Sequence, residues 1–383
     1  MLALGRDSLG LPLDRLQGYQ AMLGVPVPDA TQWDQSEPVG DCGSGVLAYL
    51  ERLAAQGELI YQDDTTGRML SLIGETFQMR AQAAAMGFSR PKERTGMSTT
   101  ALVVKVGEQR ICLYDSGRAH AGDNRKALLS QRQAERAKPL VMSEALSHNE
   151  ADETRLSRCH CLAHGRRQFS DLEDVFPQEC QVVLEALKQV FDHDEHARNE
   201  QLSSKARLAY HQDSSRPIMD ALKKWLDTQR DDRLVEPNSA LGKAMTSLQG
   251  HWETLTRFFS VSGAPLDNTR VERALKRFIR QRKNSLLYAT EHSAYIASVL
   301  TSLIATCLHA GVNALESLVA LQEHRAEVCA DPAAWLPWTS QARLAPPSTM
   351  RRQSGALWAR SGSPCHRTLM RSRADRGTRA SVV

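Results

Sequence analysis

The sequence predicts an α/β protein with a mixed sheet, a large all-helical insertion and flanking helices. Three observations support this class. Short runs near residues 59–65 and 99–114 alternate apolar and polar side chains, as half-buried strands do. Most of the remaining chain carries apolar residues at helical spacing. A chain of 383 residues also has room for two or three domains and a sizeable core.

The first 57 residues are expected to form a helical segment ahead of the sheet. Apolar side chains recur at helical spacing over residues 13–23 and 44–56, and Pro26 and Pro28 interrupt the pattern between them. We therefore expect two helices that pack against the rest of the chain.

The first predicted strand, residues 59–65, ends in two carboxylates, Asp63 and Asp64. Neighbouring residues of a strand point to opposite faces of the sheet. Only one of the two acids can therefore face a given site, and the sequence leaves open which one does.

A second acid-bearing strand follows after a hairpin and a helix. The expected elements are a loop over residues 75–98, a hairpin formed by 99–106 and 110–114, a helix over 125–137 and a strand over 139–144. The last of these ends at Glu144. This order, completed by an acid on a late helix, is consistent with a ribonuclease-H-like core, whose first part would be residues 58–168.

Residues 169–263 predict an all-helical insertion between the second and third acids, because three apolar stripes recur there at helical spacing. No polar residue recurs on these stripes, so their aromatic residues are interpreted as packing rather than as platforms for base stacking. Residues 264–338 would add the late helix and the C-terminal helices. The Arg- and Ser-rich residues 339–383 are expected to be disordered.

The late helix, within residues 265–284, combines an apolar face with a band of cations and one acid, Glu272. Thr269 and Glu272 have the spacing of a capping box, in which the glutamate only returns a hydrogen bond to the helix start. The alternative is a metal ligand held beside a phosphodiester backbone. The cations of the band are Arg270, Arg273, Lys276, Arg277, Arg280 and Lys283.

Three carboxylates from separate elements could together hold divalent ions. Phosphodiester cleavage by in-line displacement is served by two metal ions with hard oxygen ligands. Asp63 or Asp64, together with Glu144 and Glu272, are the candidate catalytic and metal-binding residues, and Mg²⁺ or Mn²⁺ is the expected cofactor. Asp152 and Asp115 are alternative acids, neither of which closes a buried strand as Glu144 does.

The late-helix segment also resembles a known family. Asp267-Asn268-x-x-x-Glu272-Arg273-Ala274-Leu275, followed by a basic run that ends at Asn284, resembles the third-acid region of the insertion-sequence-sixty-six family of bacterial DDE transposases. The resemblance runs from about Leu9 to Pro347 and selects Asp63 as the first acid, from an Asp-acid-Thr motif. It implies DNA strand cleavage and strand transfer on transposon ends and target DNA, by a homo-oligomer that accessory proteins of the same element assist.

A histidine segment carries a second part of the resemblance. Cys161-Leu162-Ala163-His164-Gly165-Arg166-Arg167-Gln168-Phe169 is similar to the family's Cys-x-Ala-His-x-Arg-Arg-x-Phe motif, which places His164 and Arg166 near the active site and the DNA. The neighbouring Cys159 and His160 lack the usual spacing of zinc ligands and favour a strand instead. The candidate DNA-binding residues are His164, Arg166, Arg167, Arg273, Lys276 and Arg280.

Departures from the family pattern predict weakened or absent catalysis. Glu144 stands where similar members have Asp, and metal-bridging geometry tolerates little displacement. Ala119 stands where a basic residue is frequent. Longer members begin with a coiled-coil and zinc-binding region, so the sequence is interpreted as an N-terminally truncated copy. The alternative function is a non-catalytic, DNA-binding remnant of a transposase.

Charge and hydropathy bound the remaining possibilities. The net charge is +4, but nine arginines and one acid follow Gln341, so the preceding part is mildly acidic and any DNA surface must arise from clustering. The eight cysteines and the N-terminus suggest a cytoplasmic protein without a membrane anchor. The resemblance implies that it is bacterial and associated with the nucleoid. The apolar run 294–312 contains several hydroxyl residues and is interpreted as a buried core helix.

Residues 192–196, a cluster of acids and histidines within the predicted insertion, are interpreted as a link between two helices.

Overall fold

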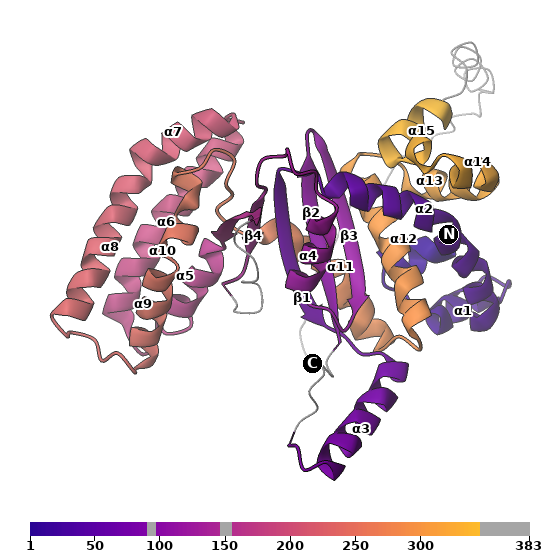
Figure 1. The fold of residues 1–383 in the computed structure, drawn as a ribbon, viewed down its shortest axis with the longest axis horizontal. Coiled ribbons are helices and arrows are strands. Elements are labelled where there is room, and N and C mark those ends of the chain that lie inside the picture. Colours follow the sequence, from indigo (N-terminus) through magenta and orange to yellow (C-terminus); the bar gives the residue numbers. More distant parts are fainter. Residues whose placement is uncertain (90–96, 146–154, 345–383) are drawn as a thin grey trace, which may run out of the picture. The chain divides into compact units, whose positions relative to one another are not determined.

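A five-stranded mixed sheet with the order β3-β2-β1-β4-β5 carries the candidate acids (Figure 1). The strands are β1 (Leu59–Thr66), β2 (Ser98–Val106), β3 (Gln109–Gly117), β4 (Leu140–Ser143) and β5 (Ser157–His160). β1 is antiparallel to β2 and parallel to β4, and β4 is parallel to β5. This computed structural model describes residues 1–89, 97–145 and 155–344. The sheet order confirms the expected ribonuclease-H-like core.

The predicted hairpin is present, with a tight turn at Gly107, whose φ of 57° favours glycine. The helix expected over residues 125–137 begins earlier and ends earlier, as α4 (Ala121–Ser130). Its start is fixed by polar groups that helical spacing does not reveal, since the backbone amide of Ala121 donates to the carboxylate of Asp64 at 3.2 Å.

The two faces of the sheet pack against different helices because strand side chains alternate. Ile60 faces the cluster formed with α2 (Asp29–Ala54) and α12 (Glu291–His309). Tyr61, its neighbour in β1, faces the opposite cluster, to which α11 (Thr269–Ser285) contributes Val271 and Leu275. The late helix therefore lies on one face of the sheet, and every second residue of β1 points toward it.

α12 is the buried core helix that the sequence predicts, and its hydroxyl residues have a structural use. β3 is an edge strand of the sheet. Ser302 accepts a hydrogen bond from the amide of Tyr114 at 2.8 Å, and Thr306 accepts one from the amide of Cys112 at 3.1 Å. The helix thus satisfies edge amides that would otherwise be free to pair with another strand. Among the described helices, none is long and apolar enough to cross a membrane.

The segment 169–263 is helical, as predicted, and has its own core. Its helices are α6 (Pro177–Asn199), α7 (Ser204–Ser214), α8 (Arg216–Asp231), α9 (Ala240–Gly250), α10 (Trp252–Leu255) and the short η4 (Arg257–Phe259). Leu187, Leu226 and Leu248 belong to one buried cluster, which also takes in Leu162 and Phe169 of α5 (Leu162–Ser170). One prediction is wrong here. Residues 192–196 lie inside α6 and do not link two helices, because the buried Asp194 pairs with Arg207 of α7 at 2.6 Å.

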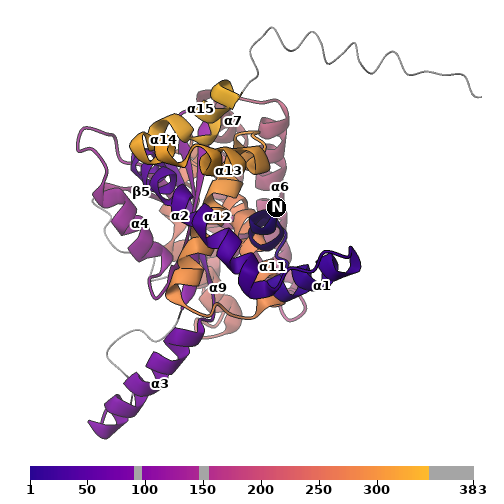
Figure 2. The same cartoon turned by 90° about the vertical axis from the view of Figure 1, so that its right-hand side faces the viewer.

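Residues 75–85 of the expected loop 75–98 belong instead to a helix, α3 (Leu70–Ala85), which projects away from the sheet in both ribbon views (Figures 1 and 2). Leu72 and Ala83 are its buried residues, while Phe77 is 75% exposed. The segment lacks a continuous apolar stripe, so helical periodicity did not reveal it. Its alanines, glutamines and leucines favour a helix through intrinsic propensity alone.

Flanking helices complete the described chain. They are η1 (Leu4–Ser8), α1 (Leu13–Met22), α13 (Ala314–Glu323), α14 (Arg325–Ala330), η5 (Pro332–Trp335) and α15 (Pro337–Leu344). The second N-terminal helix is longer than the expected 44–56, since α2 starts at Asp29 and includes Pro38. The expectation for the tail concerns residues that lie mostly outside the described ranges.

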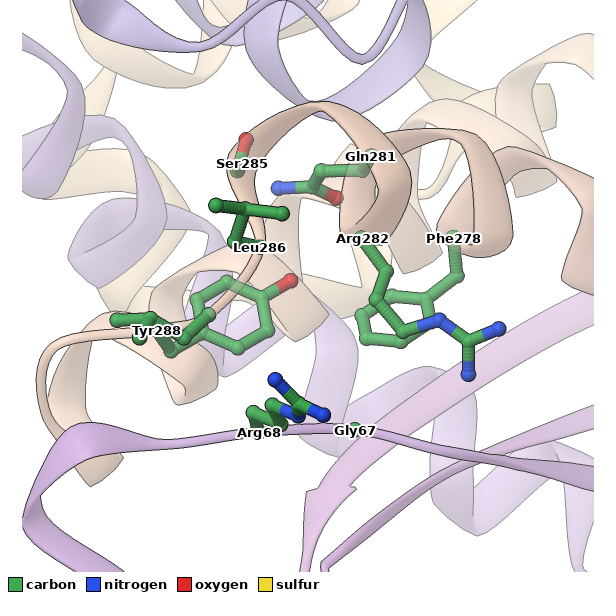
Figure 3. Close-up of a pocket in the computed structure, with 9 residues that line it drawn as sticks. Gly67, Arg68, Phe278, Gln281, Arg282, Ser285, Leu286 and Tyr288 are labelled. Carbon is green, nitrogen blue, oxygen red and sulfur yellow. The ribbon is translucent and has the colours of Figure 1, made fainter. Parts of the chain in front are cut away.

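The C-terminal part of α11 is hydrogen-bonded to the C-terminal end of β1, and Figure 3 shows Arg282, which makes these bonds. Arg282 donates to the hydroxyl of Thr65 at 2.9 Å and also to the carbonyl of Thr66. The amide of Tyr288 donates to the carbonyl of Arg68 at 3.0 Å. These contacts hold the late helix against the strand that carries Asp63.

Candidate active site

The three candidate acids come from three elements that the sheet topology brings together. Asp63 lies in β1, Glu144 directly follows β4, and Glu272 lies in the first turn of α11. β1 and β4 are parallel neighbours, so Asp63 and Glu144 lie near the carboxyl ends of adjacent strands. Ligand sites form at such ends in α/β sheets.

Asp63 and Asp64 face different surroundings, as strand alternation requires. The carboxylate of Asp64 accepts the amide of Ala121 at 3.2 Å and lies 3.0 Å from Nδ1 of His120, so it caps α4. Asp63 lies on the other face, where Glu144 and His164 act on it electrostatically. Asp63 is thus the acid that points toward the second candidate.

The start of α11 does not have the capping-box geometry. Asn268 is the N-cap residue and Thr269 is the first helical residue, so the spacing of Thr269 and Glu272 is one position out of register. The carboxylate of Asp267 accepts the amide of Thr269 at 3.0 Å and takes over the capping role. The side chain of Glu272 is therefore available for another use.

His164, in α5, lies between two of the acids. Its Nε2 is 2.5 Å from Oε1 of Glu144, and its Nδ1 is 3.8 Å from Oε1 of Glu272. Nδ1 is buried, and no hydrogen-bond partner for it is found among the described residues. Cys161, His164 and Glu272 each offer an atom within 4.8 Å of the other two, a group that could hold a metal ion. His164 is therefore the common neighbour of the candidate residues.

The charges in this cluster shift two pKa values. Burial and the negative charge of Glu144 raise the pKa of Asp63 to about 7, although the amide of Asp64 donates to its carboxylate. Contacts with Cys161 and Glu144 raise the pKa of His164 to about 10, so the imidazole carries a positive charge at neutral pH. The cluster thus concentrates negative charge around one imidazolium.

A cavity of about 220 Å³ opens beside this cluster. Glu144, Cys161 and His164 line one side, and Leu248 and His251 of the helical insertion line the other. The insertion is therefore part of the wall of the candidate site.

Asn268 ties the three parts of the site together and is fully buried. Its side-chain amide donates to the carbonyl of Gln62 at 3.0 Å, and its backbone amide donates to Sγ of Cys161 at 3.2 Å. The residue joins β1, the start of α5 and the N-terminus of α11. Sequence reasoning assigned no role to Asn268 or Cys161. Their signal was the Asp-Asn pair before the late helix and the cysteine three residues before His164.

The sequence model of a protein family described as "Transposase IS66 family" matches residues 2–295, which is more than half of the chain. The chain belongs to the IS66 transposase family. The ribonuclease-H-like sheet agrees with this family assignment.

Several relatives of this IS66 family member come from Sinorhizobium fredii (strain NBRC 101917 / NGR234). The uncharacterized protein y4jD is 30% identical over 155 residues, which is 40% of this chain and 29% of y4jD. The uncharacterized protein y4qI is 24% identical over 323 residues, which is 83% of this chain and 57% of y4qI. The matched chain spans less than two thirds of the length of these relatives. No solved structure matches the chain.

The candidate DNA-binding residues of this IS66 family member lie on two helices beside the acids. Their side chains are exposed except for those of His164 and Arg166, which are half-buried. The set comprises His164, Arg166 and Arg167 of α5 and Arg273, Lys276 and Arg280 of α11.

The remaining candidates are separated from the cluster or fall outside the described residues. Asp115 lies in β3 and lines a different cavity with Glu51 of α2, on the face away from α11. Asp152 lies outside the described residues. Cys159 and His160 form part of β5, as the strand interpretation expected, and His160 bonds Thr254 at 2.9 Å.

Proposed function

We propose that this chain is a divalent-metal-dependent polynucleotidyl transferase that cleaves DNA strands at transposon ends and joins them to target DNA. The observation that supports it is the convergence of Asp63 of β1, Glu144 at the end of β4 and Glu272 of α11 around His164. The family assignment supplies the reaction class.

The donor set fits a hard divalent cation. Carboxylate oxygens are the ligands that Mg²⁺ and Mn²⁺ prefer. The raised pKa of Asp63 also shows that its negative charge, buried beside Glu144, lacks sufficient compensation within the protein. Asp63, Glu144 and Glu272 would hold the cation, which would stabilise the attacking and leaving oxygens of the phosphodiester.

His164 would balance the charge of the acids and position them. Its imidazolium donates to Glu144 and lies near Glu272, so it holds both side chains at one place before substrate binds. Asn268 would fix the start of α11 relative to β1 and so set the distance between Glu272 and Asp63. Arg273, Lys276 and Arg280, exposed on α11, and Arg166 and Arg167 of α5 would contact DNA phosphates.

We further propose that Glu144 weakens catalysis. The side chain is one methylene longer than the aspartate that similar members carry, and catalytic metal sites lose function when a ligand shifts by about 1 Å. The carboxylate of Glu144 lies 2.5 Å from Nε2 of His164, so in this structure the glutamate side chain extends to the histidine.

A nicking assay tests this proposal. Labelled transposon-end DNA would be incubated with the natural chain and with Glu144→Asp, in Mg²⁺ and in EDTA. We expect Mg²⁺-dependent nicking that Glu144→Asp increases at least tenfold and that Asp63→Asn or Glu272→Gln reduces by at least a hundredfold. Arg230→Gln is the matched control, because it changes an exposed arginine of α8 that is not among the candidate residues. This variant should nick DNA like the natural chain. Nicking that survives both acid substitutions would contradict the site.

The second candidate is a non-catalytic DNA-binding remnant, favoured by the close pairing of Glu144 with His164. This function predicts DNA binding by the natural chain and by Glu144→Asp, with no nicking by either in Mg²⁺ or Mn²⁺. Homo-oligomerisation on DNA and accessory proteins of the same element belong to both proposals. Sedimentation of the chain with and without end DNA tests the first of these.

A further inference from the structure

A second cavity, of about 500 Å³, lies on the sheet face that carries Asp63. It lies between the first residues of β1 and β4, the start of α7 and the N-terminus of α11. Its charged lining residues are Glu58, Lys105, Arg110, Arg207 and Arg270, together with the phenol of Tyr61. Four cations and one acid therefore share one concave surface.

Two of these cations already have partners. Lys105 lies 3.2 Å from Glu58, and Arg207 pairs with the buried Asp194 at 2.6 Å. Arg110 and Arg270 differ. Within the described ranges, neither forms an ion pair with a carboxylate. The guanidinium of Arg270 lies 5.9 Å from the centre of the Tyr61 ring.

The two arginines are close enough to repel each other. Partial burial and the charge of Arg270 lower the pKa of Arg110. Burial also lowers the pKa of His309 on α12, as do the charges of Arg110, Arg277 and Arg270. A bound anion would relieve this repulsion, and the side chain of Tyr61 lines the same cavity.

The cavity lies close to the proposed active site along both β1 and α11, although the two cavities share no lining residue. Tyr61 precedes Asp63 by two residues in β1, and Arg270 precedes Glu272 by two residues in α11. Two strand residues span about 7 Å, and one DNA strand advances about 3.4 Å per phosphate. A strand whose scissile bond lies at the carboxylates would therefore bring another phosphate to the cavity within a few nucleotides.

We propose that Arg110 and Arg270 bind a backbone phosphate of the substrate DNA, a few nucleotides from the bond to be cut. This inference rests on the proposed function and names a contact outside the candidate DNA-binding residues of α5 and α11, which include neither Arg110 nor Arg270. The occupant is a DNA strand rather than a free nucleotide, because the cavity adjoins the cluster where the strand would be cut and the ring of Tyr61 is covered by Arg270.

The test measures binding without cleavage. A fluorescein-labelled end duplex is titrated with the full chain in EDTA, over a range of salt concentrations, and followed by anisotropy. Arg110→Gln with Arg270→Gln should weaken binding roughly tenfold and reduce the slope of log affinity against log salt by about 1. Arg110→Lys with Arg270→Lys keeps both charges and should restore most of the affinity. Arg230→Gln is the surface control.

Each outcome decides the proposal. If Arg110→Gln with Arg270→Gln binds the duplex with the affinity and salt slope of the natural chain, the proposal is wrong. It is also wrong if millimolar ATP or inorganic phosphate displaces the duplex more than chloride does at equal ionic strength. Both arginines are exposed, and thermal unfolding checks that the variants fold. A chain that needs the pair for binding yet never nicks DNA contradicts only the proposed catalysis. Nicking that is unaffected by the glutamine pair contradicts only this contact.

Discussion

Asp63 and Asp64 are neighbours in β1 with opposite physical roles. Asp63 is held in a negative, partly buried environment that raises its pKa to about 7, while Asp64 caps α4. A carboxyl group whose pKa is raised in the folded state destabilises the fold above that pKa. That penalty disappears as the pH falls toward the ordinary pKa of Asp.

Asp63→Asn should therefore stabilise the fold while it removes nicking. We expect the free energy of unfolding at pH 8 to rise by on the order of 1–3 kcal/mol, with the gain shrinking as the pH falls from 7 toward 4. Urea unfolding at several pH values measures it. Asp64→Ala is the matched neighbour and should lower stability by about 1 kcal/mol through loss of the helix cap. A loss of stability in Asp63→Asn at pH 8 would contradict the electrostatic account.

The sequence could predict that the two acids point apart but not which of them faces the site. That choice depends on the register with β2 and on the position of α4, both of which are set by distant residues. Glu272 shows the same limit. Its capping-box spacing was present in the sequence, and only the capping of Thr269 by Asp267 decided against that role.

α12 shows how a buried helix can carry polar residues without weakening the core. Ser302 and Thr306 accept hydrogen bonds from the amides of Tyr114 and Cys112, on the outer side of β3. The pattern of hydroxyls on an apolar helix was visible in the sequence. Their partners were not, because those partners lie almost 200 residues away on the chain.

Ser302→Ala with Thr306→Val should leave two buried edge amides without acceptors. Each such loss costs about 1–3 kcal/mol, so thermal and urea unfolding should show the double variant destabilised by roughly 2–6 kcal/mol. Thr301→Val is the control, since Thr301 is buried in the same helix but bonds no β3 amide among the described residues. Equal stability of the pair and the control would show that the edge amides find other partners.

α3 marks the opposite case, an element that periodicity missed. Prediction from apolar spacing detects helices that bury a face, and α3 buries only Leu72 and Ala83. The helices of the insertion were predicted correctly for the converse reason, because each has a stripe that packs into their shared core.

The chain has separate cores for the sheet and for the insertion, and the cavity beside Glu144 depends on both. Leu303 belongs to the cluster between the sheet, α2 and α12, while Leu187 belongs to the cluster of the insertion. The order of acids along the chain predicted the sheet, but not the contribution of Leu248 and His251 to the site wall. That contribution depends on how two cores pack, which apolar patterns do not encode.

Leu187→Ala should loosen the insertion before the sheet. The substitution removes a fully buried side chain and should destabilise by about 2–5 kcal/mol. Hydrogen exchange should rise in α6, α8 and α9, while the amides of β1 and β2 keep their protection. Leu303→Ala should instead raise exchange in the sheet. A uniform rise across the chain in Leu187→Ala would show that the two cores unfold as one.

Asp63 and Glu272 are separated by more than half of the polypeptide, and Asn268 has to reach back to the carbonyl of Gln62 before Glu272 takes its place. A ribosome therefore releases the first acid long before it has synthesised the last. The nascent chain can hold a folded sheet hairpin, yet it lacks Glu272, the last of the three proposed metal ligands. Under the proposed function, translation therefore delays nuclease activity until the late helix has emerged and docked.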